Sequence, residues 1–378
     1  MAKKKRKIRA DFRKNRSQRS RKSDLTREYQ DHGFQQDESQ RSERVSGKGD
    51  LSRRRTIVVS DDADSPRADD NIAPDVDLSV CLCGTVLSVG GLQNPVQADD
   101  GRVFQCATRR LLKTISTDQR NVVAAGDRVL FRPADNQEGI IERVEPRHGV
   151  LCRTSRGRRH VIVANVDLLL IVASAAEPML KPNLIDRLLV TAEKSEIMPV
   201  VCINKVDLVH VPDLQPLVGV YGQLGYQVLQ LSATSNSGVE RLRCLVRGRR
   251  SVVVGQSGVG KSSLLNAIEP GLQLKVSTVS TETEKGRHTT TAARLIPLDC
   301  GGFMVDTPGI RQFQLWDVIP AELAGFFADI RPFVSHCHYP DCTHIHELDC
   351  AVKHAVAEGR LDVRRYESYC QIAQSDVA

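Results

Sequence analysis

The sequence lacks a long apolar run and any segment that resembles an export signal. Its longest largely apolar stretch, Leu168 to Ala176, has nine residues including Ser174, whereas a membrane-spanning helix needs about 20. The basic N-terminus has no apolar segment behind it, which argues against a secretory signal peptide. These absences exclude a membrane protein and predict a cytoplasmic location.

A disulfide framework is not expected either. The chain has eleven cysteines in 378 residues, and without an export signal they indicate a reducing compartment and a metal site. Hydrophobic residues make up 40% of the chain and charged residues 26%, which is typical of a soluble protein with substantial cores. At about 100–200 residues per domain, the length allows two to four domains.

Positive charge is concentrated in one tail. Residues 1–22 hold six Lys, six Arg and one acid, a local charge of +11, so the other 356 residues carry −4 of the net +7. A cationic tail with few apolar residues cannot offset its ordering entropy, and we expect it to be disordered when free. Its Lys/Arg density favours nucleic-acid binding; a solubilising or targeting extension is the alternative.

The pattern along the chain predicts four segments. Residues 1–77 form the basic extension and a polar linker. Residues 78–153 contain short β-rich runs separated by turns, which favours a small barrel of OB type. Residues 154–316 alternate strands with helices, so we expect a parallel doubly wound α/β sheet. Residues 317–378 are predicted to be helices interrupted by a Cys/His cluster.

A phosphate-binding loop is the strongest motif. The run GQSGVGKSS follows a predicted strand (251–254) and precedes a predicted helix (263–268), the context that such a loop requires. Glycines let backbone N–H groups converge on phosphate, Lys261 reaches the β- and γ-phosphates, and Ser262 ligates Mg²⁺. The predicted phosphate-binding residues are Gly255, Gln256, Ser257, Gly258, Val259, Gly260, Lys261, Ser262 and Ser263.

A second motif predicts that the nucleotide is a guanine nucleotide. The run NKVD follows the predicted strand MPVVCI, and ligands bind at that end of a parallel sheet. The Asp207 carboxylate accepts two hydrogen bonds from the guanine N1–H and N2 amine, a donor pair that adenine lacks. The Ala233 N–H is suited to guanine O6, and Asn204 to the purine N7 and the loop backbone. The predicted base-binding residues are Asn204, Lys205, Val206, Asp207, Ser232, Ala233 and Thr234.

Switch residues are predicted between and after these motifs. Asp306 follows the strand GGFMV and begins the run DTPG; it holds the Mg²⁺ shell, while the Gly309 N–H meets the γ-phosphate. In the run GRHTTT, Thr290 is the first candidate to close over Mg²⁺ and Thr289 the second. His288 either positions the attacking water or is an ordinary loop residue.

The C-terminal segment contains Cys-x4-Cys-x-His-x5-Cys. Three thiolates and one imidazole complete a tetrahedral Zn²⁺ site with no open position, so the predicted zinc is structural. Its predicted ligands are Cys337, Cys342, His344 and Cys350. Three other histidines compete with His344, which ranks first because it lies two residues after Cys342; the competitors are His336, His338 and His346.

The motif order is unusual, because the base-reading run precedes the phosphate loop by about 50 residues. With the small barrel before it and the Cys/His cluster after it, the chain resembles the ribosome small-subunit-dependent GTPase family over about 78–372. Local stretches that carry this resemblance are AGDRV, VIVANVD, IDRLLV, GQSGVGKSS, GRHTTT, DTPGIR and CAVKHAVAEGRLDVRRYESY. The chain departs from the family in its longer extension and in HELDC, where a Pro-Gly pair usually precedes the last Cys.

The resemblance implies a circularly permuted GTPase with an OB domain that contacts small-subunit rRNA, a zinc domain, and a late role in maturation of the 30S subunit. We therefore expect a cytoplasmic, monomeric GTPase that uses Mg²⁺ and one Zn²⁺ and is stimulated by the subunit. Two alternatives are an RNA-binding switch with negligible turnover and a P-loop ATPase or kinase; Asn204 and Asp207 argue against the latter.

Overall fold

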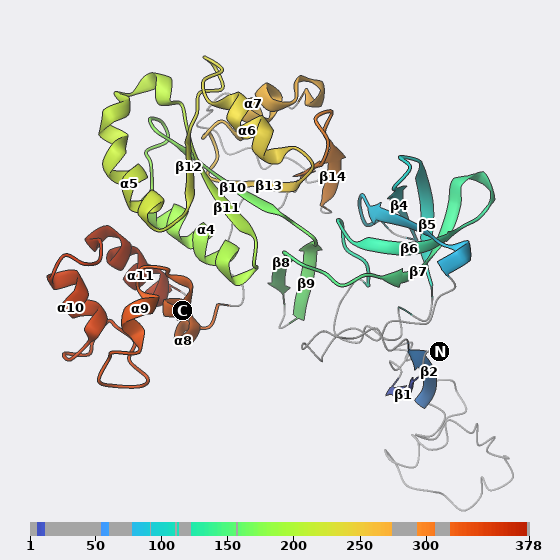
Figure 1. Cartoon of the computed structure of the whole chain (residues 1–378), viewed down its shortest axis with the longest axis horizontal. Coiled ribbons are helices and arrows are strands. Elements are labelled where there is room, and N and C mark those ends of the chain that lie inside the picture. The colour runs from blue at the N-terminus through green and yellow to red at the C-terminus, as the bar shows by residue number, and fades with distance from the viewer. Residues whose placement is uncertain are drawn as a thin grey trace, which may run out of the picture.

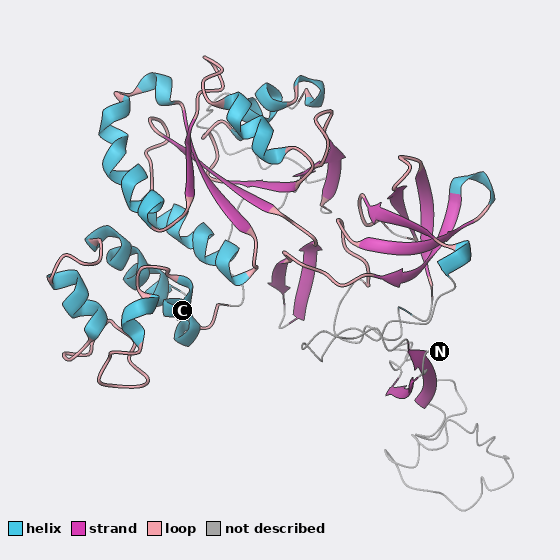
Figure 2. Cartoon of the chain, in the orientation of Figure 1, coloured by secondary structure: helices cyan, strands magenta, loops and turns pink. Residues whose placement is uncertain are grey.

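The computed structural model has a barrel, an α/β sheet domain and a C-terminal helical lobe, joined in that order (Figures 1 and 2). It describes residues 6–11, 54–59, 78–90, 92–109, 112, 122–155, 158–273, 293–306 and 318–375. None of the helices in these ranges is both long and apolar enough to cross a membrane.

Two short strands lie within the extension that the sequence predicts to be disordered. They are β1 (Arg6–Asp11) and β2 (Arg54–Val59), which pair antiparallel with Ile8 opposite Ile57 and Asp11 opposite Arg54. An isolated two-stranded ribbon of this kind is marginally stable in water.

The barrel has the strand order β3-β4-β5-β7-β6 and closes by pairing β6 with β3. Strand β7 runs parallel to β5, and the other pairs are antiparallel. This arrangement confirms the predicted OB-type barrel. Alternate residues of β4 and β5 face the core. The strands are β3 (Leu82–Val86), β4 (Gln93–Ala98), β5 (Val103–Thr108), β6 (Arg128–Pro133) and β7 (Glu138–Val144), with 3-10 turns at Leu78–Val80 and Asp135–Gln137.

A hairpin of β8 (Leu151–Ser155) and β9 (Arg158–Val163) leads from the barrel to the sheet. The domain boundary expected at residue 153 falls inside its first strand. The barrel also contacts the sheet directly, since the Leu295 N–H donates to the Leu87 carbonyl at 2.8 Å. The Arg250 guanidinium donates to the Thr85 hydroxyl at 3.2 Å. Backbone and side-chain bonds therefore fix the barrel against the sheet.

The central sheet has six strands in the order β12-β11-β10-β13-β15-β14. Its strands are β10 (Leu168–Ser174), β11 (Met198–Asn204), β12 (Gln227–Gln230), β13 (Arg250–Val254), β14 (Arg294–Pro297) and β15 (Phe303–Asp306). The strands β12, β11, β10, β13 and β15 run parallel, as the sequence predicts, and the structure adds β14, which pairs antiparallel with β15. A short turn joins β14 to β15 as a hairpin, and Pro297 is compatible with an edge strand, where one N–H can be missing.

Helices cover both faces of this sheet, as expected for a doubly wound fold (Figure 2). All seven residues of β10 are buried, because apolar side chains pack on it from both sides. The helices α4 (Pro182–Lys194) and α5 (Gln215–Gln223) share one core with the sheet. The helices α6 (Val239–Val246) and α7 (Lys261–Ile268) share the other. Single 3-10 turns occur at Val206–Leu208, Val211–Leu214 and Pro270–Leu272.

The C-terminal lobe packs against α4 of the sheet domain (Figure 1). Its helices are α8 (Pro320–Leu323), α9 (Arg331–Val334), α10 (Ala351–Ala357) and α11 (Val363–Ser375), with a 3-10 turn at Ala324–Phe326. Its core includes Val190, which α4 contributes from its outer side. The lobe therefore shares apolar contacts with the sheet domain.

Candidate functional site: a nucleotide pocket and a separate metal cluster

The predicted phosphate loop lies between β13 and α7, and the helix begins at Lys261, two residues earlier than the sequence suggests. A Cβ atom at Gly255, where φ is 144°, would lie 2.1 Å from the Val172 carbonyl oxygen. Only glycine fits there, so the loop can run tightly over β10. The Lys261 Nζ donates to the carbonyls of Gly255 and Gln256 at 2.9 and 2.7 Å. The ammonium thus lies over the loop, near the positive end of the helix dipole.

Asn204 connects three loops at the carboxyl edge of the sheet. Its side chain is 1% exposed, donates from Nδ2 to the Val259 carbonyl at 2.9 Å, and accepts the Ala233 N–H at 3.3 Å. The predicted base loop, phosphate loop and 232–234 loop are therefore joined by one amide. A guanine O6 would have to share the Ala233 N–H with Asn204.

Neighbouring segments hold Lys205 and Val206 of the predicted base loop in place. Lys205 has a left-handed backbone with φ of 65°, and its Nζ donates to the Glu177 carbonyl at 2.5 Å. Val206 is buried and its N–H donates to the Leu231 carbonyl. The Asp207 carboxylate is exposed, so it is accessible to a nucleotide base.

The 232–234 loop has its own internal support. Ser232 is fully buried, and its hydroxyl accepts the Ser235 N–H at 3.0 Å. Its N–H donates to the Ser237 carbonyl at 3.0 Å. Ala233 is half-buried and Thr234 is exposed. The structure thus brings this loop beside Asn204.

Sequence reasoning missed the segment after β10. Ser174 is paired with Asn204 in the parallel register, and its hydroxyl donates to the Glu177 carbonyl at 3.0 Å. That carbonyl also accepts the Lys205 ammonium. The detectable signal is a serine at the end of a wholly apolar strand, at the same sheet edge as the two motifs.

The predicted switch residues fall largely outside the described part of the chain. These are His288, Thr289, Thr290 and Gly309. Asp306 is described as the last residue of β15, where it pairs with Arg294 of β14. Since β15 neighbours β13 in parallel, its end lies at the same edge as the phosphate loop.

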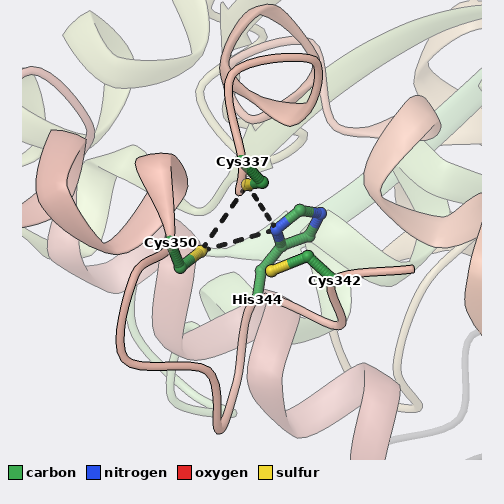
Figure 3. A group of neighbouring side chains, drawn as sticks. All are labelled: Cys337, Cys342, His344 and Cys350. Atoms are coloured by element: carbon green, nitrogen blue, oxygen red, sulfur yellow. Dashed lines mark hydrogen bonds between the residues drawn. The ribbon is translucent and has the colours of Figure 1, made fainter. Parts of the chain in front are cut away.

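The cluster Cys337, Cys342, His344 and Cys350 lies in the C-terminal lobe, with all four ligand atoms within 4.8 Å of one another (Figure 3). The Cys337 and Cys350 sulfurs are 3.9 Å apart, and each is 3.4–3.5 Å from His344 Nδ1. A tetrahedron with Zn–S of about 2.3 Å and Zn–N of about 2.0 Å has edges of about 3.5–3.8 Å. The donors of Cys337, Cys350 and His344 therefore match these edges, and Cys342 lies close enough to complete a Zn²⁺ site.

The structure separates His344 from its three competitors. His344 is 2% exposed, whereas His336, His338 and His346 are exposed. Burial lowers the pKa of His344, which favours the neutral imidazole that a metal requires. The Tyr366 hydroxyl donates to the His344 carbonyl at 2.8 Å, so α11 also supports the ligand loop.

The HELDC segment organises the ligand loop through Glu347. Its carboxylate accepts hydrogen bonds from the Thr343 N–H and hydroxyl at 2.8 and 2.7 Å and from the Ile345 N–H at 3.2 Å. Burial opposes ionisation, but these donors lower the pKa of Glu347 to about 2. A charged carboxylate thus closes the turn around His344.

The phosphate loop, the NKVD loop and the end of β15 meet at one sheet edge, while their order along the chain is permuted. This combination defines a circularly permuted P-loop GTPase. Residues 144–316 match the family model described as RsgA GTPase. The small ribosomal subunit biogenesis GTPase RsgA of Azotobacter vinelandii is 40% identical over 301 residues, which cover 77% of this chain and 85% of that protein. Its counterpart in Pseudomonas fluorescens is 40% identical over 309 residues, covering 79% and 87%.

Solved structures agree with this assignment. The crystal structure of YjeQ from Thermotoga maritima has a TM-score of 0.65 at 34% identity, covering 78% of this chain and 98% of that one. The circularly permuted GTPase YloQ has a TM-score of 0.62 at 29% identity, covering 80% and 97%. The chain belongs to the RsgA GTPase family and is a GTP hydrolase.

Proposed function

We propose that this GTPase binds the small (30S) ribosomal subunit and hydrolyses GTP to GDP and phosphate late in the maturation of that subunit. Relatives named for small-subunit biogenesis align with more than three quarters of the chain. One structural observation supports binding to the subunit that depends on the bound nucleotide. The barrel bonds to β14 through Leu87 and Leu295, and Arg294 at the start of β14 lies four residues after the predicted switch residue Thr290.

In this proposal the sheet edge holds GTP and Mg²⁺. Asp207 reads the guanine, Lys261 binds the phosphates, and Ser262 and Thr290 ligate Mg²⁺. The other predicted base- and phosphate-loop residues complete these contacts, with Asp306 holding the Mg²⁺ shell and the Gly309 N–H meeting the γ-phosphate. The contacts of Asn204 support this assignment, because they bring the base loop against the phosphate loop.

The Cys3His cluster is proposed to hold one structural Zn²⁺. Four protein donors leave no position open for substrate. The ion would connect the segment after α9, which carries Cys337, to Cys350 at the start of α10. The zinc lobe, the barrel and the basic residues 1–22 are the proposed contacts to rRNA, with the protein acting as a cytoplasmic monomer.

Turnover of the isolated protein is proposed to be slow. Ile310 follows the run DTPG, where many GTPases carry a Gln that orients the attacking water, and an isoleucine side chain cannot hold water. Unassisted GTPases turn over at about 10⁻⁴ to 10⁻² per second. Binding of the subunit would raise this rate by ordering the switch that carries His288.

Co-sedimentation with purified small and large subunits tests the partner. We expect the protein to pellet with small subunits in a non-hydrolysable GTP analogue and to be released in GDP. Equal binding to both subunits, or equal binding in both nucleotides, contradicts the proposal. Multiple-turnover rates with and without small subunits test the stimulation, and negligible turnover in both conditions would favour the RNA-binding switch. ATP that competes equally with GTP would contradict the guanine assignment.

A further inference from the structure

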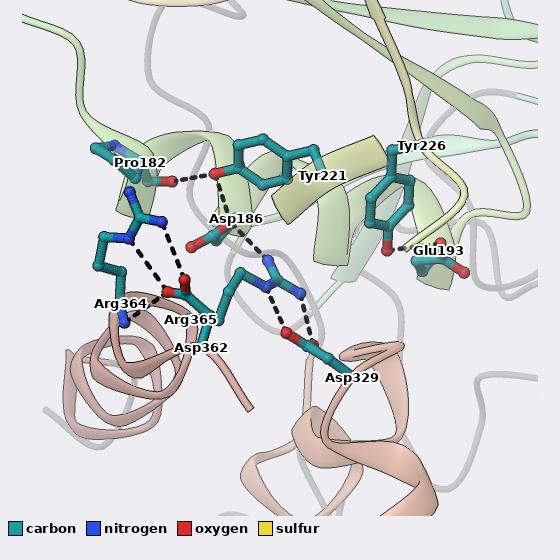
Figure 4. Close-up of polar contacts among 9 residues, drawn as sticks. All are labelled: Pro182, Asp186, Glu193, Tyr221, Tyr226, Asp329, Asp362, Arg364 and Arg365. Carbon is teal, nitrogen blue, oxygen red and sulfur yellow. Dashed lines mark hydrogen bonds and ion pairs between the residues drawn. The ribbon is translucent and has the colours of Figure 1, made fainter. Parts of the chain in front are cut away.

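Two stretches that carry the family resemblance hold no predicted nucleotide or zinc ligand, and the structure brings them together. IDRLLV lies in α4, and VRRYESY begins α11 of the C-terminal lobe. They meet through Asp186 and Arg365, which are 179 residues apart in sequence and 1% and 2% exposed (Figure 4). A buried ion pair thus spans the interface between the sheet domain and the lobe.

Arg365 is held by two carboxylates at once. Its guanidinium makes a bidentate pair with Asp329 of the lobe at 2.8 and 2.9 Å, and donates to Asp186 of α4 at 2.5 Å. Burial alone would lower the pKa of Arg365, but the two carboxylates raise it, so the charge persists. Removing one partner of such a pair leaves a buried charge uncompensated, which is strongly destabilising.

Asp186 also connects α4 to α5. Its Oδ1 accepts the Tyr221 hydroxyl at 2.9 Å, and the same hydroxyl lies 3.4 Å from the Pro182 carbonyl in the first turn of α4 (Figure 4). Tyr221 is in α5 and is 1% exposed. The lobe, α4 and α5 are therefore joined at one buried point.

Both helices begin at the loops that form the guanine pocket. The chain passes from Ser174, at the end of β10, through residues 175–181 into α4. It passes from Asn204–Asp207 through two 3-10 turns into α5. The Lys205 ammonium joins the two loops through the Glu177 carbonyl. A shift of α4 relative to α5 would thus change the positions of Lys205 and Asp207.

We propose that Arg365 of the C-terminal lobe is a positioning residue for the guanine pocket. It acts through Asp186 and Tyr221, which hold α4 and α5 in the relative position that places Lys205 and Asp207 around the base. Docking of the lobe therefore strengthens nucleotide binding, and a partner that displaces the lobe weakens it. This inference rests on the proposed guanine-binding role of the NKVD loop.

Tyr221→Phe and Tyr226→Phe form a matched pair of variants. Tyr226 also donates to a carboxylate of α4, Glu193 at 3.1 Å, but at the other end of that helix (Figure 4). Each variant loses one hydroxyl, and only Tyr221 lies at the end that leads from the pocket. We expect Tyr221→Phe to weaken binding of a fluorescent GDP analogue about two- to tenfold and Tyr226→Phe to leave it unchanged. Equal affinities in the two variants would overturn the proposal.

Arg365→Met and Arg364→Met test the lobe itself. Arg364 pairs with Asp362 on the surface, so its loss is expected to leave GDP affinity unchanged. Arg365→Met is expected to weaken GDP about two- to thirtyfold and to raise KM for GTP with kcat unchanged. Zinc content and thermal unfolding are measured alongside. If Arg365→Met loses its zinc or unfolds, Asp186→Asn replaces it, because that variant leaves every zinc ligand and Asp329 intact and should weaken GDP in the same direction.

Three outcomes separate the possibilities. If Arg365→Met or Asp186→Asn weakens GDP while Tyr221→Phe does not, the lobe acts by another route and the proposed path is wrong. If folded Arg365→Met, or its replacement Asp186→Asn, binds GDP normally, the lobe does not position the pocket. If Asp207→Asn also leaves GDP affinity unchanged, the proposed guanine pocket itself fails; loss of affinity only in Asp207→Asn refutes this inference alone.

Discussion

Replacing Asn204 with alanine is expected to weaken GDP binding and to lower the stability of the sheet domain together. The Asn204 amide bonds to the Val259 carbonyl at 2.9 Å and to the Ala233 N–H at 3.3 Å. In Asn204→Ala both backbone partners stay in place and lose their hydrogen bond. Because Asn204 is 1% exposed, water can replace the amide only where the loops open.

The magnitude follows from these two bonds. A hydrogen bond contributes about 0.5–1.5 kcal/mol, and a buried group left unpaired costs about 1–3 kcal/mol. Ala233 is half-buried and can recover part of its loss from water, so the free energy of unfolding should fall by about 2–3 kcal/mol. The loops also shift in the folded state. If this shift removes about half of that free energy from nucleotide binding, GDP affinity falls about tenfold, equivalent to about 1.4 kcal/mol.

Chemical denaturation followed by circular dichroism measures the free energy of unfolding. Titration with a fluorescent GDP analogue measures the nucleotide affinity. Asn183→Ala is the control, since Asn183 is exposed and donates only across the surface to Gln371; it should change stability by less than about 0.5 kcal/mol. If Asn204→Ala is as stable as Asn183→Ala and binds GDP like the wild type, the amide is not the connection between the loops that its contacts indicate.

Three further predictions concern the base, the metal and catalysis. Asp207→Asn should weaken GTP and improve xanthosine triphosphate, whose ring has a carbonyl in place of the amine; unchanged GTP affinity would refute the base assignment. Purified protein should contain one zinc per chain, which Cys337→Ser should release. Because burial raises the pKa of Cys342 to about 12, zinc must displace thiol protons, and its apparent affinity should increase with pH; a pH-independent affinity would contradict a thiolate site. His288→Ala should lose most of the subunit-stimulated rate with little change in GTP affinity, and full stimulation in that variant would make His288 an ordinary loop residue.

The sequence by itself determined the parts of this protein whose chemistry lies in contiguous residues. A glycine-rich turn between a strand and a helix commonly binds phosphate. The run from Gly255 to Ser262 therefore predicted the phosphate loop from contiguous residues alone. The order of NKVD before that loop predicted the permutation. The spacing of Cys337, Cys342 and Cys350 predicted a closed tetrahedral site, because thiolate chemistry and short loops constrain the choice.

Only the tertiary structure decided what depends on packing between distant segments. It placed His344 rather than three nearby histidines against the thiolates, because burial and the Tyr366 hydroxyl fix that loop. It added β14 as an antiparallel edge that a four-residue pattern cannot reveal. It also brought Asp186 and Arg365 together across 179 residues. Such contacts depend on how helices pack on the sheet, and this packing has no signature in the local order of residues.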